Sequence, residues 1–405
     1  MRASVLTLST LLLGFALMQM GNGLQGTLLA VRAGIEGFGA LPTGLIMSGF
    51  FAGMSAGSLI APRLIDRVGH IRTFAALASL ASAAALMHLA FVNPWVWIAV
   101  RCLTGFAFAG LIIVTESWLN ASVSSDQRGR LLSIYGMAGM AAGALGQFLL
   151  NLGDPATFTL FVLVSIVMSL ALVPISLARV EGPRSEETQE PSSLRRLWTL
   201  SPYGAVAAAL VGASIGSFYG LAPLFAQELD YSQARIAALI AFFTIGGLLL
   251  QFPLGWVSDR VSRRGLGIGL ATGGTLLMLA FIPFPAPPPI ILLAAGFAVG
   301  GLVLPAQAIA VAHVHDRAPR SALLAVSGGL VLMQGIGASL GPLFVGALMD
   351  WIGPRGLPLG LASLQGAIAL WGLLRVTIRD DPETRERHAA PPLTPHPVEG
   401  DLSGD

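Results

Sequence analysis

The sequence predicts an all-α integral membrane protein with twelve transmembrane helices in two pseudo-symmetric six-helix bundles. Three observations predict this class. Hydrophobic residues make up 54% of the 405-residue chain and charged residues only 11%, against about 25% in a soluble domain. Apolar runs of 18 residues or more recur along the whole chain, as in membrane-spanning helices. Finally, several segments of the first half have similar counterparts in the second half.

Twelve apolar runs are long enough to cross a bilayer, which takes about 20 residues of helix. We place helices at 4–30, 40–62, 73–92, 95–117, 129–151, 156–178, 202–227, 234–257, 266–283, 289–312, 321–349 and 357–376. The first run also resembles a signal peptide. It has polar Asn22 and Gln25 in its interior and a counterpart later in the chain, so we predict a membrane helix there.

Two polar stretches divide the chain. Residues 179–201 form the longest polar segment between apolar runs and separate the first six helices from the last six. We therefore predict an N-terminal bundle at 1–178, a cytoplasmic linker at 179–201 and a C-terminal bundle at 202–378. Residues 379–405 are rich in Pro, Asp, Glu and Arg without apolar periodicity, a composition typical of a disordered tail.

The distribution of arginine predicts the orientation. All 23 basic residues are arginines, and an even number of spans puts both termini on one face. Outside the spans, only Arg32, Arg235 and Arg355 fall on the opposite face. Because basic loops stay inside, we expect both termini to be cytoplasmic, in a bacterial inner (plasma) membrane. Trp95 and Trp97 then fall at the outer interface, where indole rings are favoured.

Three pairs of segments indicate a duplicated unit. TGFAFAGLIIVTE (104–116) aligns with AGFAVGGLVLPAQ (295–307), and GALGQ (143–147) with ASLGP (338–342). DRVGHIR (66–72) resembles DRVSRR (259–264). A duplicated six-helix unit is typical of transporters that rock two halves about a central site.

These motifs resemble those of the major facilitator superfamily of transporters. Its signature loop is matched by Gly255-x-x-x-Asp259-Arg260-x-x-Arg263-Arg264 and by Asp66-Arg67-x-Gly69-His70-x-Arg72. Arg101-x-x-x-Gly105 resembles the second family motif, which is linked to coupling in proton-coupled exporters. GHIRTF (69–74) and TESWLN (115–120) resemble a small, poorly characterised subgroup of bacterial permeases. The resemblance covers the chain to about residue 378 and implies a twelve-helix permease.

A charged cluster at the predicted inner face is a candidate cytoplasmic gate. Helix N-termini favour a nearby carboxylate. In the family's arrangement, Asp66 is expected to cap the eleventh helix and Asp259 the fifth, each across the interface between halves, when the inner side is closed. Anchoring by positive charge alone explains the arginines but not the two aspartates. The gate candidates are Asp66, Arg67, Arg72, Asp259, Arg260, Arg263 and Arg264.

Polar side chains within spans are costly and indicate function. Arg101 and Glu116 lie about 60° apart around the fourth helix, so both can face one cavity. The alternatives are snorkelling of Arg101 to the interface and a Glu116 that only ends the helix. Met18, Asn22 and Gln25 share one face of the first helix.

The remaining site candidates lie on helices that, by the resemblance, build the pore. They are Tyr135, Gln147, Ser217, Tyr219, Gln307 and Gln334. For an isolated Gln or Ser, the alternative is a hydrogen bond between helices. His88 and His313, near helix ends, are expected at the membrane interface.

Several functional classes are excluded. The sequence contains no P-loop, no Cys- or His-based metal cluster and no arguable catalytic triad, so we predict neither an enzyme nor an ATP-driven pump, and no cofactor or metal. The net charge of +2 does not indicate a nucleic-acid partner.

We predict a monomeric secondary active transporter of a small amphipathic or organic solute, working by alternating access in the lipid bilayer. Protons are the expected coupling ion because Glu116 is the one carboxylate clearly within a predicted span. Export is favoured over uptake. The alternatives are an uncoupled facilitator and a non-transporting membrane sensor or assembly factor with a transporter fold.

Overall fold

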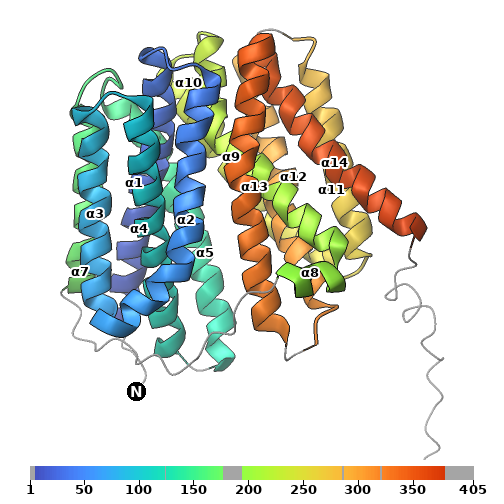
Figure 1. The fold of residues 1–405 in the computed structure, drawn as a ribbon, viewed down its shortest axis with the longest axis horizontal. Coiled ribbons are helices and arrows are strands. Elements are labelled where there is room, and N and C mark those ends of the chain that lie inside the picture. Colours follow the sequence, from blue (N-terminus) through green and yellow to red (C-terminus); the bar gives the residue numbers. More distant parts are fainter. Residues whose placement is uncertain (1–4, 124, 177–193, 285–286, 320–321, 379–405) are drawn as a thin grey trace, which may run out of the picture.

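Two adjacent groups of helices make up the protein (Figure 1). The computed structural model describes residues 5–123, 125–176, 194–284, 287–319 and 322–378. Within these ranges, every regular secondary-structure element is a helix. In Figure 1 the N-terminus lies at the lower face of the molecule. We call this the terminal face and the opposite one the distal face.

The first group, the N-terminal set, precedes the predicted linker. It comprises α1 (Val5–Ile35), α2 (Ala40–Val68), α3 (His70–Ala90), α4 (Pro94–Ser122), α5 (Ser125–Phe148), η1 (Leu149–Leu152), α6 (Thr159–Leu170) and α7 (Leu172–Ser176). The second group, the C-terminal set, comprises α8 (Leu194–Leu200), α9 (Pro202–Glu228), α10 (Gln233–Ser258), α11 (Arg263–Phe281), α12 (Pro289–His315), α13 (Leu323–Ile352), η3 (Gly353–Arg355) and α14 (Gly356–Ile378).

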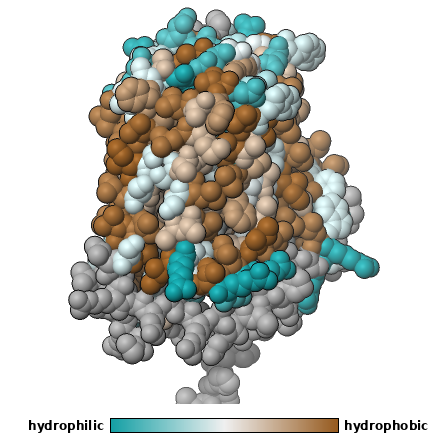
Figure 2. Space-filling view, turned by 60° about the vertical axis from the view of Figure 1, so that its left-hand side comes forward, coloured by the Kyte–Doolittle hydropathy of each residue, from teal (hydrophilic) through white to brown (hydrophobic). Residues whose placement is uncertain are grey.

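The surface and the helix lengths fit a membrane-spanning protein. Ten segments of the described chain are long and apolar enough to cross a bilayer, and one of them, 325–375, covers most of both α13 and α14. Helix α1 packs beside them against α5, α6 and α9. Counting α6 and α7 as one span, the described residues thus contain the twelve expected helical segments. Figure 2 shows a broad hydrophobic band below a hydrophilic end.

Three predictions about element boundaries need comment. The predicted helix 156–178 is interrupted after Leu170, because Pro174 lacks the N–H group that would bond the carbonyl of Leu170. The predicted linker 179–201 is not polar coil throughout, since 194–200 forms the short helix α8. Its remainder up to residue 193, and the predicted disordered tail at 379–405, lie outside the described residues.

Glycines allow close helix contacts at equivalent positions of the two sets. A Cβ at Gly53 of α2 would overlap the carbonyl oxygen of Cys102 on α4. A Cβ at Gly246 of α10 would likewise overlap the carbonyl oxygen of Phe297 on α12. Small residues are the usual means of bringing membrane helices together, so these glycines fix how closely each helix pair packs.

The repeated segments GALGQ and ASLGP take part in a second pair of close contacts. Gly146 of α5 packs against the backbone of Met20 on α1, and Gly341 of α13 packs against the backbone of Ala213 on α9. Each position has room for hydrogen only. The similarity seen in the sequence therefore corresponds to similar helix packing in both sets.

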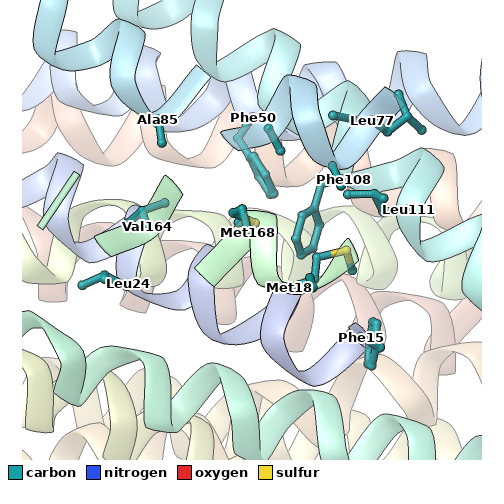
Figure 3. Close-up of a cluster of buried hydrophobic side chains, with 14 of the residues drawn as sticks. Phe15, Met18, Leu24, Phe50, Leu77, Ala85, Phe108, Leu111, Val164 and Met168 are labelled. Atoms are coloured by element: carbon teal, nitrogen blue, oxygen red, sulfur yellow. The ribbon is translucent and has the colours of Figure 1, made fainter. Parts of the chain in front are cut away.

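Each set has its own cluster of buried hydrophobic side chains. Phe15, Met18, Phe50 and Phe108 belong to the cluster of the N-terminal set and come from α1, α2 and α4 (Figure 3). A second large cluster is formed mainly by α9–α14. Dispersion contacts among these closely packed side chains hold the helices of each set together.

Three residues expected at the membrane interface lie near helix ends, but their side chains are buried against other helices. Trp97 is fully buried, unlike Trp95, and its indole N–H lies 2.8 Å from the carbonyl oxygen of Phe91. His88 and His313 are buried as well. The reason is that these residues face neighbouring helices: His88 packs edge-on against Trp97, and His313 against Tyr203.

At the distal face, the two sets are joined by hydrogen bonds. Asp350 near the end of α13 accepts bonds from the backbone N–H groups of Ala40 (2.8 Å) and Leu41 (3.1 Å), the first residues of α2. Gln233 at the start of α10 donates to the carbonyl oxygen of Gly153 (2.8 Å). Among the described residues, the recorded side-chain hydrogen bonds between the sets all lie at this face. A carboxylate from one set thus caps a helix of the other.

Removing this cap should loosen the distal closure. Loss of an N-cap costs about 1 kcal/mol, so Asp350→Ala should shift the equilibrium about fivefold towards a distally open form. An impermeant thiol reagent added at the distal face should label Met47→Cys faster in a Cys102→Ser background. Asp350→Asn, which keeps one acceptor oxygen, should give a smaller effect. Equal labelling of all three proteins would contradict the assignment.

Candidate functional site

A cavity of about 330 Å³ lies between the two sets. This volume lies at the lower end of the range for small-molecule pockets, about 300–1,000 Å³. Helices α1, α2, α4 and α5 supply most of the lining, and α9 and α10 the rest. The lining residues are Gln19, Asn22, Gly23, Gly26, Thr27, Met47, Phe50, Phe51, Met54, Arg101, Phe108, Ile112, Gly139, Met140, Gly143, Gln147, Ile215, Tyr219, Gly220 and Thr244.

Arg101 is the charged residue of this lining. Its side chain is only 4% exposed, so it does not snorkel to the surface. The guanidinium carbon lies 4.4 Å from the centre of the Phe50 ring, a cation–π contact. Its Nε and Nη1 groups have no hydrogen-bond partner. The arginine is therefore fixed in place with donors unused.

The remaining polar groups of the cavity fall into two kinds. Some are paired: the Thr27 hydroxyl donates to Gln147, and the hydroxyl groups of Tyr219 and Thr244 lie 2.9 Å apart. Others are not: the side-chain oxygens of Gln19 and Asn22 are buried without a partner. The unpaired groups are available to a solute, and the paired ones shape the wall.

The structure brings together four of the predicted site residues: Asn22, Arg101, Gln147 and Tyr219 all line the cavity. Gln25 is buried but does not line it, and Met18 lies in the hydrophobic cluster. The side of α1 that faces the cavity thus runs through Gln19, Asn22 and Gly26, and Asn22 is the member of the predicted face that lies on it.

Three further predicted residues lie away from the cavity lining. The Ser217 hydroxyl donates to the carbonyl oxygen of Ala213 in its own helix (2.7 Å). Gln307 and Gln334 bond to each other across α12 and α13, at 2.8 Å. This is the alternative expected for isolated polar residues, a hydrogen bond between helices. The cavity is consequently built more by the N-terminal set than the predicted pore helices implied.

Glu116 and Tyr135 lie beside each other on α4 and α5, outside the cavity lining. Glu116 follows Ile112, a lining residue, by one turn of α4 towards the terminal face. Tyr135 stacks on Phe15 with ring centres 4.0 Å apart. Arg101 and Glu116 therefore lie along one side of α4, the first in the cavity and the second between the cavity and the terminal face.

The predicted gate residues lie at the helix ends of the terminal face. Asp66, Arg67 and Arg72 are exposed. Asp66 is exposed and, among the described residues, forms no hydrogen bond with the start of α13, so the expected cap is not made in this state.

In the second half, the gate charges interact within their own set. Arg263 bridges Asp259 and Asp316, at 3.1 Å from each. Arg260 stacks over the Trp256 ring, 3.5 Å from its centre. Arg264 donates to the carbonyl oxygen of Arg375 at 3.4 Å. The carboxylate of Asp259 is thus paired with a neighbour in sequence.

Sequence reasoning missed several lining residues. Phe50, Phe51 and Phe108 look like ordinary apolar residues of a span, and nothing in the sequence separates them from the core. Gln19 and Thr27 carried a usable signal, because they fall three residues before Asn22 and five after it on a helix already rich in polar groups. Thr244 carried none.

The fold and the cavity define a multi-pass membrane protein with a central solute-sized chamber between two groups of helices, which is the organisation of a membrane transporter. The Major Facilitator Superfamily model matches residues 11–240 and 204–400. The chain belongs to this family of transporters.

Relatives are similar along most of their length. The chain is 28% identical over 360 residues to an Escherichia fergusonii protein called uncharacterized MFS-type transporter YcaD, covering 87% of this chain and 92% of the relative. It is also 28% identical over 346 residues to YcaD of Salmonella agona (strain SL483), covering 84% and 88%.

Solved structures share the fold. The nucleoside transporter NupG superposes with a TM-score of 0.79 at 13% identity, covering 93% of this chain and all of NupG. A bacterial homolog of the human lysosomal transporter Spinster, in an inward-facing and unoccupied conformation, gives 0.70 at 17% identity, covering 93% and 96%. At such identities the likeness concerns the fold alone.

Filling the cavity should block access without unfolding the protein. A Cβ at Gly26 would meet no atom within 4 Å, so Gly26→Leu should occupy the cavity without a clash. Removing a helical glycine should leave stability unchanged or raise it by about 0.5–1 kcal/mol. The measurements are the melting temperature and maleimide labelling of Thr244→Cys in a Cys102→Ser background, which should slow several-fold.

Gly136→Leu is the matched control, since Gly136 of α5 also has open space around it and does not line the cavity. It should label at the parental rate. If Thr244→Cys is labelled at the same rate in the Gly26→Leu and Gly136→Leu variants, the cavity is not the access route.

Proposed function

We propose that this protein is a proton-coupled secondary transporter that moves a small amphipathic or organic solute across the bacterial inner membrane by alternating access, with export as the favoured direction. The observation that carries the proposal is the cavity between the two sets, because both sets supply lining residues. A movement of one set against the other would therefore change access to the cavity.

The contacts between the sets support two access states. The distal face is held by Asp350 on the start of α2 and by Gln233 on Gly153, whereas Asp66 at the terminal face is exposed and forms no bond with α13 among the described residues. In the proposed cycle, the distal contacts break, and Asp66 and Asp259 then cap α13 and α5 at the terminal face. With the termini in the cytoplasm, as the arginine distribution favours, the proposed cycle assigns the described state, with its distal contacts made, to the inward-facing side of the cycle.

The lining supports a small, partly apolar solute. Aromatic and methionine side chains make up much of the wall, and methionine adapts to varied apolar shapes. A sugar would need more donors and acceptors than the few unpaired groups of this cavity offer. Glu116 supports proton coupling, since it lies between the cavity and the terminal face in a partly buried position.

Transport in proteoliposomes tests the proposal. Purified protein is reconstituted, and a panel of small organic solutes is screened by mass spectrometry with and without a pH gradient. An exporter that exchanges solute for protons accumulates solute in vesicles with an acidic lumen, and a symporter does so with an acidic exterior. Solute movement at the same rate with and without the pH gradient would indicate a facilitator. No movement of any solute, with a partner protein co-purifying, would indicate the sensor or assembly factor.

Glu116→Gln should uncouple transport from protons. The amide keeps the size of the side chain and cannot carry a proton, so gradient-driven accumulation should be lost while downhill movement continues. Accumulation and solute-dependent proton flux, followed with a dye in the lumen, provide the measurement. Tyr135→Phe is the control, because it removes a neighbouring hydroxyl group and leaves the carboxylate. Full accumulation by Glu116→Gln would rule out this coupling role.

Asp66→Asn should have the opposite effect to Asp350→Ala. If Asp66 caps α13 only in the state closed at the terminal face, then neutralising it disfavours that state and reduces labelling of Met47→Cys from the distal face. The charge at a helix terminus contributes about 0.3–1 kcal/mol, so a change of about two- to fivefold is expected. A rise in distal labelling would contradict the proposed gate.

A further inference from the structure

The charge of the cavity identifies the class of solute. Of its twenty lining residues, one, Arg101, is a cation and none is an acid. Glu116 lies fifteen residues further along α4, about 22 Å from Arg101 along the helix axis, and cannot pair with it. Within the described residues, no ion pair of Arg101 is recorded. The cavity therefore carries an uncompensated positive charge.

Such a charge is costly to keep in a dry site. Desolvating an unpaired ion in a protein carries a substantial penalty, which a bound counter-ion offsets. The cation–π contact with Phe50 compensates only part of it. That contact also holds the guanidinium group in position, so the site is organised before a solute arrives.

The hydrogen-bonding groups agree with the charge. The unpartnered Nε and Nη1 of Arg101 are donors, and guanidinium N–H groups form their strongest hydrogen bonds with carboxylate or phosphate oxygens. The amides of Gln19 and Asn22, also without partners at their oxygens, add groups that can serve a polar end of the solute.

The rest of the wall sets the body of the solute. Phe50 and Phe108 lie with ring centres 5.8 Å apart, and Phe51, Met54 and Met140 complete an apolar surface. Polyanions such as nucleoside phosphates are disfavoured, because the lining offers one positive charge. A solute with an apolar or aromatic body and a single acidic group fits both the arginine and the apolar wall of the cavity.

We propose that the transported solute is a small organic monocarboxylate, whose carboxylate binds Arg101 and whose apolar body lies against the phenylalanines and methionines. This inference rests on the proposed transport function and specifies its substrate class. Arg101 is then a binding residue for the solute.

The potential of the cavity can be tested without knowing the solute. In a Cys102→Ser background, Met54→Cys is reacted with anionic ethylsulfonate and cationic ethyltrimethylammonium methanethiosulfonates. Met137→Cys, on an exposed side chain outside the lining, corrects for intrinsic reactivity. Arg101 should favour the anionic reagent about tenfold at position 54. Arg101→Lys should keep this preference and Arg101→Gln should abolish it. No preference, or one that survives Arg101→Gln, overturns the inference.

Binding of matched compounds tests the class directly. The melting temperature of the purified protein is measured with benzoate, phenylacetate and hexanoate, each against its neutral amide at equal ionic strength. At least one acid should raise the melting temperature where its amide does not, and Arg101→Gln should lose the effect. Acids that never exceed their amides overturn the inference, and this comparison in the wild-type protein holds even if the variant does not fold.

The two proposals fail separately. Gradient-driven flux of a neutral or cationic solute that survives Arg101→Gln overturns the monocarboxylate inference and leaves the transporter intact. Carboxylate binding with the anionic preference, but no flux of any solute, supports the site and overturns the proposed function.

Discussion

The structure depends on the requirement that a chain in lipid must satisfy its backbone hydrogen bonds within itself. Every long segment of the described chain meets this requirement as a helix, and helix packing then decides everything else. Without water there is little hydrophobic drive between helices in a bilayer, so association relies on close contact and on a few polar bonds. Gly53 against Cys102 and Gly146 against Met20 are two of these close contacts.

The same requirement explains where the cavity can form. Two pairs of helices in each set are held together by glycines, and these contacts leave no space for a solute. Glycines also bring the two sets together, since a Cβ at Gly44 of α2 would overlap the carbonyl oxygen of Pro342 on α13. The recorded side-chain hydrogen bonds between the sets lie at helix ends of the distal face. A carboxylate on a helix end is a bond of modest strength between rigid parts. The boundary between the sets is thus the site of the cavity and is held by both kinds of contact.

Arg101 connects this architecture with function. A buried cation with unused donors is expensive for a protein unless something binds it. Its position in a wall of aromatic and methionine side chains joins a charge to an apolar surface in one small chamber. Glu116, on the same helix and nearer the terminal face, is too far away to neutralise the arginine. One helix of the N-terminal set thereby carries both charged candidates.

The sequence by itself determined the class of the protein. Composition and apolar runs predicted the helical membrane fold, and the boundaries of most helices followed within a few residues, because lipid selects long apolar segments. The motifs of the loops also identified the family, which the family match confirms. These features are local, and each can be recognised without knowing its neighbours.

Only the tertiary structure decided which side chains share a cavity. Asn22, Arg101 and Gln147 were found from sequence because polar groups stand out in a span, but Gln25 and Ser217, equally polar, lie outside the lining. Phe50 and Thr244 also line the cavity, although nothing in the sequence distinguishes them from other residues of their spans. The cap from Asp350 to α2 joins residues 310 positions apart. Which face a helix presents depends on its rotation against distant neighbours, and that rotation is set by packing.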